Sequence, residues 1–133
     1  MREILFRGKP IHDRSTLEWI EGGIKTKDGR AFIIGMSSKM RVEAMEVDPN
    51  TVGQYTGMNI YGERIFEGDI LKLDYIGEGR GVKGVAEVAF QNGKFGLLWG
   101  YRKELVPLDG FANVKMEIIG NIYDNPELLG GGE

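Results

Sequence analysis

The chain has 133 residues, of which 21 are glycine and 4 are proline, close to a fifth of the sequence against roughly 12% in average usage. Such frequent turn-forming residues are typical of many short strands. The chain contains no cysteine and one histidine, His12, which excludes disulfides, thiolate metal sites and cysteine nucleophiles. Its formal net charge of -3 argues against a protein built mainly to coat nucleic acid or an anionic membrane.

No segment of the sequence is expected to enter a membrane or an export pathway. The longest apolar stretch, residues 31–34, is far too short to span a bilayer. The opening residues, 1–4, do not begin a signal peptide with an apolar centre. We therefore expect a soluble, cytoplasmic protein with no membrane partner.

Residues 1–57 are predicted to form a β-rich region that contains a tight hairpin. An Asp-Gly pair at 28–29 lies between two β-prone runs, residues 17–24 and 30–34. Such a pair favours a type I′ turn, because both central residues of that turn need positive φ. A helix starting at Ser15 is the alternative for the first run, but two consecutive glycines would end it after less than two turns.

Weaker signals flank this hairpin. Residues 2–8 alternate weakly and are predicted to form a strand. Residues 37–47 fit either a strand or a helical stripe, and we favour a strand that ends before Pro49. Residues 51–57 follow, with glycines that mark bends. They are interpreted as a joint between two subregions, with a functional surface as the alternative.

Residues 58–129 are predicted to form a small barrel of the SH3-like type. A long loop is expected after its first strand, and an Asn-Gly pair at 92–93 predicts a tight hairpin between its second and third strands. Gly96 lies inside a strand and indicates a bulge or a bend at a barrel corner. Closure of the barrel would remove the exposed strand edges. The five short strands are expected at residues 69–75, 82–90, 94–99, 104–108 and 114–123.

Local signals mark both ends of the barrel region. Residues 67–69 predict a turn in which Asp69 caps backbone N–H groups. Asn125, followed by proline, predicts one short turn of helix, and residues 130–133 are expected to be a loose tail. The fold class is therefore mainly β with minor α, with an N-terminal β-hairpin region joined to a C-terminal SH3-like barrel.

The motifs that usually carry chemistry are incomplete in this sequence. Residues 79–84 satisfy a dinucleotide-binding glycine pattern, but a predicted strand follows it in place of the required helix. His12 has an acidic neighbour and no nucleophile placed for it to activate. The acidic residues between 63 and 74 lack the spacing of a calcium loop. We predict no catalytic residue, no metal site, no cofactor and no small-molecule substrate, and hence a protein that is not an enzyme.

A basic and aromatic stretch between residues 80 and 103 is the candidate binding surface. It holds five basic residues and one acidic residue, and its aromatic side chains adjoin cations. Aromatic rings beside cations can stack on nucleic-acid bases or hold an acidic peptide. Ordinary solvated strand ends, with one ring in the core, are the alternative. The candidate residues are Arg80, Lys83, Lys94, Trp99, Tyr101, Arg102 and Lys103.

Four strings spread along the chain carry a resemblance to a known family. They are residues 2–7, residues 47–57 with the string Thr-Val-Gly-Gln-Tyr-Thr-Gly, residues 61–70, and residues 117–129 with Gly-Asn-Ile-Tyr-Asp-Asn-Pro-Glu-Leu-Leu. The sequence resembles the YopX family of small bacteriophage and prophage proteins. The resemblance implies a mainly β fold that ends in an SH3-like barrel, in a protein of the bacterial cytoplasm. It implies no reaction and no catalytic residue.

Two functions remain open from the sequence. The first is a non-enzymatic accessory module that binds a second copy of itself or a host or phage protein, through a strand edge or an aromatic patch. The second is a nucleic-acid-binding protein that uses the basic and aromatic stretch.

Overall fold

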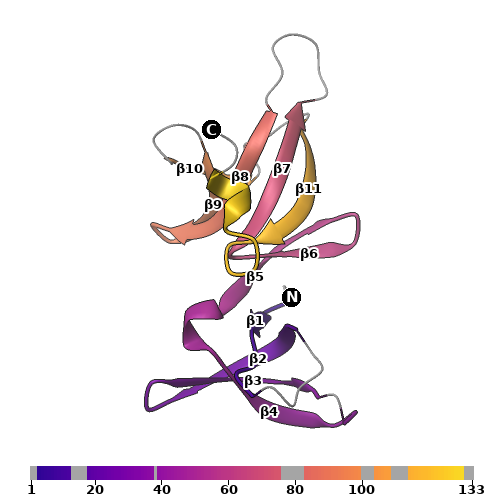
Figure 1. The fold of residues 1–133 in the computed structure, drawn as a ribbon, viewed down its shortest axis with the longest axis vertical. Helices are drawn as coiled ribbons and strands as arrows, with labels where there is room; N and C mark the ends of the chain where they lie inside the picture. Colours follow the sequence, from indigo (N-terminus) through magenta and orange to yellow (C-terminus); the bar gives the residue numbers. More distant parts are fainter. Residues whose placement is uncertain are drawn as a thin grey trace. The chain divides into compact units, whose positions relative to one another are not determined.

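The computed structural model describes residues 3–12, 18–37, 39–75, 83–99, 104–108 and 114–130. The chain folds as two compact units, Met1–Gly57 and Met58–Glu133. The described residues form two antiparallel sheets and one short C-terminal α-helix, so the prediction of a mainly β fold is confirmed (Figure 1). No helix in the described part of the chain is long and apolar enough to cross a membrane.

The first sheet has six strands in the order β4-β3-β2-β1-β5-β6, so β4 lies at one edge and β6 at the other. Its fifth strand runs across the boundary between the two units at Gly57. The strands are β1 (Phe6–Gly8), β2 (Ile20–Lys27), β3 (Arg30–Met36), β4 (Val42–Val47), β5 (Gly53–Ile60) and β6 (Glu63–Phe66).

The hairpin between β2 and β3 forms where the sequence predicts it. Asp28 and Gly29 have φ values of 53° and 77°, and Lys27 pairs with Arg30 across the turn. The preceding strand begins later than predicted, at Ile20. The alternative helix starting at Ser15 lies largely outside the described residues.

The predicted strand over residues 37–47 is wrong in its first half. Met40 has a φ of 60°, and its N–H donates to the Ser37 carbonyl at 3.0 Å. The Ser37 N–H in turn donates to the Arg41 carbonyl at 2.8 Å. These bonds close a turn, so the strand β4 begins only at Val42.

Residues 51–57 are more regular than the predicted joint. A 3-10 helix, η1 (Pro49–Thr51), begins after Asp48, whose side chain accepts the Asn50 N–H at 3.0 Å. The strand β5 then starts at Gly53 without a bend. Gly57 is the one of the two predicted bends that has a positive φ, 90°.

The core of the first unit lies on one face of the β2–β4 strands. Ile20, Ala31, Ile33 and Val47 are buried there. Because successive side chains of a strand point to opposite faces, the neighbours of Ala31 and Ile33 along β3 point away from this core.

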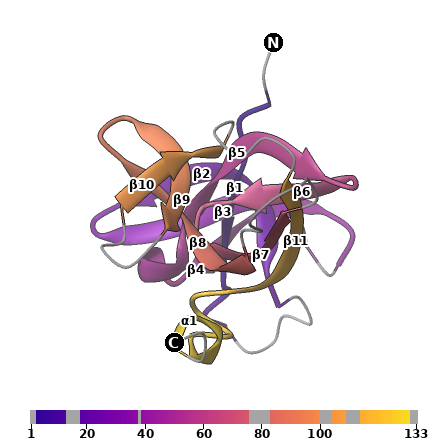
Figure 2. The ribbon, with the colours of Figure 1, turned by 90° about the horizontal axis from the view of Figure 1, so that it is seen from above.

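The second sheet has five strands in the order β10-β9-β8-β7-β11, and it forms a half-barrel. The last strand returns to pair with the first, while β10 and β11 lie at the two edges (Figure 2). The closure of this sheet into an SH3-like barrel stays a prediction. The strands are β7 (Asp69–Tyr75), β8 (Lys83–Gln91), β9 (Lys94–Trp99), β10 (Glu104–Pro107) and β11 (Val114–Asn121).

Two predicted details of this sheet have different outcomes. Asn92 and Gly93 have φ values of 53° and 79°, so the predicted tight hairpin is confirmed. Gly96 is not a bulge, because it continues the register with both Ala89 and Pro107. A side chain at this position would overlap the Val106 carbonyl of the next strand. The irregularity lies in β11 instead, between Ile118 and Gly120.

The ends of the second unit are fixed by short hydrogen bonds. Asp69 is buried and its Oδ2 accepts the Phe66 N–H at 2.8 Å, which confirms the predicted cap. The helix α1 (Glu127–Gly130) starts two residues after Asn125. The Asn125 side chain accepts the Asn121 N–H at 3.3 Å, so it stabilises the turn before the helix.

A second core fills the half-barrel. Its buried side chains come from β6, β7, β8 and β9 and from Leu108, which follows β10. They are Ile65, Leu71, Leu73, Ala86, Val88, Leu97 and Leu108.

Candidate functional site

Most of the basic and aromatic stretch lies outside the described residues. Arg80, Tyr101, Arg102 and Lys103 are in this part, and only the backbone is described for Lys83 and Trp99. Lys94 is exposed at the start of β9, beside the hairpin turn. The structure therefore does not test whether these seven residues form one surface.

An exposed apolar surface lies elsewhere, on the β3–β4 hairpin of the first unit. Ile34 is 41% exposed and Met36 is 54% exposed, while Met40 and Val42 reach 80% and 70%. We call these four residues the apolar patch. Single exposed apolar residues are common, but a group of them on one element marks an interaction surface.

Strand register explains why the patch forms. Ile34 pairs with Ala44 and Met36 pairs with Val42, so these side chains lie on the same face of the two strands. The opposite face carries Ile33, which is fully buried in the core. Both faces of this hairpin are thus apolar, although only one of them is covered by the described residues of the unit.

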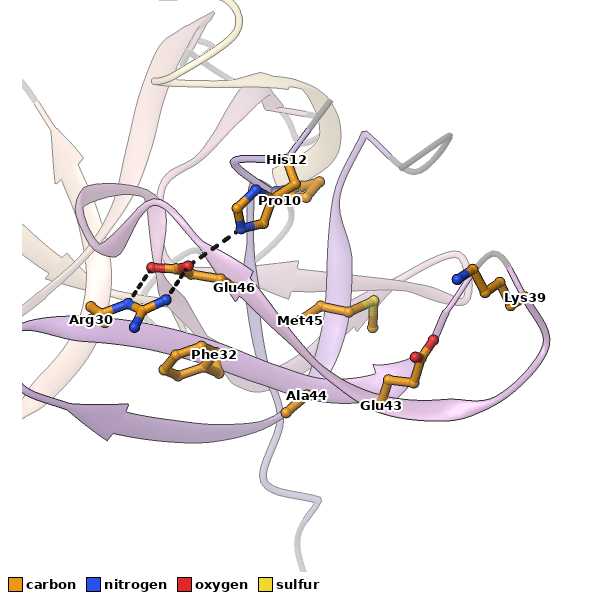
Figure 3. Close-up of a pocket in the computed structure, with 9 residues that line it drawn as sticks. All are labelled: Pro10, His12, Arg30, Phe32, Lys39, Glu43, Ala44, Met45 and Glu46. Atoms are coloured by element: carbon orange, nitrogen blue, oxygen red, sulfur yellow. Dashed lines mark hydrogen bonds and ion pairs between the residues drawn. The ribbon is translucent and has the colours of Figure 1, made fainter. Parts of the chain in front are cut away.

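A pocket of about 460 Å³ adjoins the patch on the same hairpin. Phe32 and Ala44 extend the patch into it, because each lies two residues from a patch residue on its own strand. Basic and acidic side chains line both ends of the pocket (Figure 3). The lining residues are Pro10, His12, Arg30, Phe32, Lys39, Glu43, Ala44, Met45 and Glu46.

One end of the pocket is organised around the Glu46 carboxylate, toward which Arg30 and His12 both point (Figure 3). The Arg30 Nε donates to Glu46 Oε2 at 2.8 Å, and its Nη2 donates to Oε1 at 2.7 Å. The His12 Nε2 lies 3.4 Å from the same Oε1. This fork of two hydrogen bonds from Arg30 lowers the pKa of Glu46 to about 2, with a smaller contribution from His12.

The charges of this end neutralise one another. Glu46 is only 13% exposed, and the Arg30 guanidinium lies 5.2 Å from the centre of the Phe32 ring. The Arg30 guanidinium is thus held by the carboxylate on one edge and by the ring at one face. The described residues contain no group of three side chains that could hold a metal ion.

The far end of the pocket contains Glu43 and Lys39 (Figure 3). A hydrogen bond to Ser37 lowers the pKa of Glu43, and the nearby cations Arg41 and Lys39 add to this effect. Arg41 Nη2 lies 3.8 Å from Glu43 Oε1, and the two side chains are 64% and 38% exposed. The ion pair therefore holds Arg41 loosely, whereas Glu43 is also held by its hydrogen bond to Ser37.

Residues 9–11 cover the outer edge of β4 at its C-terminal end. The Ile11 N–H donates to the Glu46 carbonyl at 3.3 Å, and the Asp48 N–H donates to the Lys9 carbonyl at 2.9 Å. Among the described residues, none forms a backbone bond to this edge before Glu46. At Val42 the apolar patch therefore meets a strand edge with which no described residue pairs.

The sequence contained a signal for this surface. Residues 31–34 are apolar without alternation, and Met36, Met40 and Val42 continue at every second or fourth position. Such a pattern gives a strand two apolar faces, and it indicates either burial on both faces or one face left for a partner. The binding surface predicted on residues 80–103 stays a prediction beside this one.

Comparisons with known proteins place the chain in a family. It is similar in fold to protein EF1440 from Enterococcus faecalis, whose crystal structure aligns with a TM-score of 0.53 and 24% identity over 97% of this chain and 99% of that one. No curated protein matches the chain. The family profile described as YopX protein matches residues 5–130. The chain therefore belongs to the YopX family.

Proposed function

We propose that the protein is a non-enzymatic protein-interaction module that binds its partner through the apolar patch on the β3–β4 hairpin. The observation that carries this proposal is the exposure of Met40 and Val42 beside an edge strand, at 80% and 70%. Apolar groups in this position are costly to leave in water and stabilise a complex when covered. Methionine adapts its shape to a partner surface, which suits this role.

The pocket supports the same function. The charges of Arg30 and Glu46 pair with each other within the protein. A partner that covers this pair therefore leaves neither charge unpaired. That arrangement fits the polar rim of a protein interface around an apolar centre. In keeping with the family resemblance, we propose that the module serves a bacteriophage or prophage in the cytoplasm of a bacterium.

Site-specific photo-crosslinking tests the proposal in bacterial cells. A photo-reactive residue replaces Val42 in one variant and Tyr61 in the control, because Tyr61 is 82% exposed and lies outside the patch. We expect discrete protein adducts from position 42 and none from position 61. The absence of protein adducts from position 42 would contradict the proposal.

A nucleic-acid-binding protein is the second candidate, and one described feature favours it. Phe90 is 49% exposed, and its ring centre lies 4.8 Å from that of Phe95 on the hairpin that also carries Lys94. An exposed ring beside a cation is the arrangement that stacks on a base.

Fluorescence anisotropy with single-stranded DNA, duplex DNA and RNA tests this candidate at low and near-physiological salt. Binding that weakens steeply with salt, and that the combined Arg102→Glu and Lys103→Glu change reduces, would support it. No binding at low salt would exclude it.

A further inference from the structure

We propose that the partner of the apolar patch is a segment of another protein that carries carboxylates beside its apolar side chains, and that these carboxylates pair with Lys25 and Lys27. The proposal rests on the proposed function and names the chemistry of the partner at that same surface. It is carried by three cations that share one face of the sheet with the patch. These residues, Lys25, Lys27 and Arg30, are called the basic cluster.

Strand register places the basic cluster and the patch on one continuous face. Lys27 pairs with Arg30 beside the turn between β2 and β3, and Lys25 lies across from Phe32 at the next position on that face. Ile34 of the patch follows two residues further along β3, so its side chain points the same way. The face is therefore basic at the turn and apolar away from it.

Two of the three cations are not neutralised by the part of the chain that the structure describes. Arg30 is held by Glu46, whose carboxylate accepts two of its hydrogen bonds. Lys25 and Lys27 are exposed, and no carboxylate among the described residues lies within ion-pair distance of either one. A partner can therefore pair with both ammonium groups without breaking a contact that is already made.

The position of Lys27 costs stability in the isolated protein. Lys27 lies directly across from Arg30, and like charges opposite each other destabilise a strand pair. Local arrangements that lower stability are found mostly at functional sites. Carboxylates of a partner would lie between these two cations and relieve their repulsion.

The apolar half of the face has room for a partner side chain beside Ile34. Gly23 lies directly across from Ile34 on β2, and a side chain at Gly23 would meet nothing within 4 Å. On its other side Ile34 pairs with Ala44, whose side chain is a single methyl group. These small neighbours leave Ile34 accessible, and an apolar side chain of the partner would remove it from water.

The composition of the face favours a protein over nucleic acid or a membrane. The patch consists of isoleucine, valine and methionine, none of which has a ring that could stack on a base. The nearest ring, Phe32, already has the Arg30 guanidinium 5.2 Å from its centre. An anionic bilayer is disfavoured by the net charge of -3 and by the Glu46 carboxylate, which lies on the same face.

Selection from a library of random peptides tests the chemistry of the partner. The purified full chain is the bait, and peptides that also bind the Val42→Asp variant are removed by counter-selection. We expect the retained peptides to combine apolar residues with Asp or Glu. The most enriched peptide is then labelled and used as the probe in fluorescence anisotropy.

Charge reversal tests whether the basic cluster recognises this probe. Lys25→Glu combined with Lys27→Glu should raise the dissociation constant about tenfold or more, because like charges then meet across the interface. The same variant should bind a copy of the probe in which Lys replaces each Asp and Glu, and the wild type should not bind that copy.

A matched control makes the same change of net charge on the second unit. It combines Lys72→Glu with Lys94→Glu, both at exposed positions, and it should bind the probe like the wild type. Thermal unfolding establishes that every variant folds. Lys27→Glu should not lower the thermal stability, because it replaces a like-charged pair by an opposite one.

The outcomes separate this inference from the proposed function. Enriched peptides without acidic residues, no enriched peptide, or an acidic probe whose affinity the reversal leaves unchanged would each overturn the inference. If position 42 still crosslinks to a protein in such a case, the interaction function stands and the acidic partner is wrong. If position 42 crosslinks to no protein, both proposals fail.

Two other ligands are tested with the same variants. Wild type is mixed with single-stranded DNA and, separately, with vesicles that contain phosphatidylglycerol. Binding to either one that the Lys25 and Lys27 reversal abolishes, and that the control retains, would overturn the protein partner in favour of that ligand.

Discussion

At the scale of the residue, Arg30 keeps Glu46 ionised far below the usual range of a carboxylic acid. The pKa of Glu46 is lowered from 4.5 to about 2 by the Arg30 hydrogen bonds. A folded-state pKa below the unfolded value means that the unfolded chain takes up a proton first as the pH falls. The contribution of Glu46 to stability is therefore complete above about pH 4.5 and is lost as the pH falls toward 2.

We predict that Glu46→Gln reduces the acid sensitivity of the first unit. Between about pH 6 and pH 3 the free energy of unfolding should fall more in the wild type than in the variant, because only the wild type has a carboxyl group at position 46 whose pKa is lowered by folding. Urea unfolding at both pH values measures the difference, with Glu63→Gln as the control for removal of an exposed carboxylate. Equal losses in wild type and Glu46→Gln would contradict the role of the ion pair.

At the scale of the element, two glycines let β2 and β3 approach each other closely. A side chain at Gly22 would overlap the Ile34 carbonyl, and one at Gly35 would overlap the Glu21 carbonyl. At Gly23, the next residue along β2, a side chain would meet nothing within 4 Å. The close approach is therefore found at Gly22 and Gly35 and not at the adjacent Gly23, and Gly35 lies between the patch residues Ile34 and Met36.

We predict that Gly22→Ala lowers the free energy of unfolding by about 1–3 kcal/mol, because the backbone has to move apart. Gly23→Ala is the matched control and should change it by no more than about 0.5 kcal/mol. Denaturant unfolding of both variants provides the measurement. Equal effects at the two positions would show that overlap with the Ile34 carbonyl does not determine the cost.

The sequence predictions are correct where the structure depends on a few neighbouring residues, and they fail where it depends on the rest of the fold. The Asp28 and Asn92 turns were predicted correctly, because positive φ in a two-residue turn depends on the two residues themselves. The strand predicted over residues 37–47 is wrong only in its first half, because the positive φ of Met40 is not signalled by a glycine. The apolar patch was not predicted, because the exposure of Val42 depends on which face of the β3–β4 hairpin packs on the core, and local sequence does not determine this.

At the scale of the whole molecule, each unit has a hydrophobic core of its own. Ile33 is fully buried in one and Leu71 in the other. Truncation of either side chain should cost about 2–5 kcal/mol, since it leaves a cavity in a packed interior.

We predict that each truncation acts mainly on its own unit. Hydrogen exchange measured by mass spectrometry should show lost protection in residues 3–57 for Ile33→Ala and in residues 58–130 for Leu71→Ala. Equal loss across both units from either variant would indicate one cooperative structure.

The short segment that covers the end of β4 also limits growth into fibrils. An edge strand that is open along its full length can template chain after chain, as in amyloid. Here the Lys9 carbonyl and the Ile11 N–H occupy the edge at Asp48 and Glu46. This end of β4 therefore has no free backbone groups at those two positions for a further chain to pair with. The covering segment thus shortens the stretch of β4 that could act as a template.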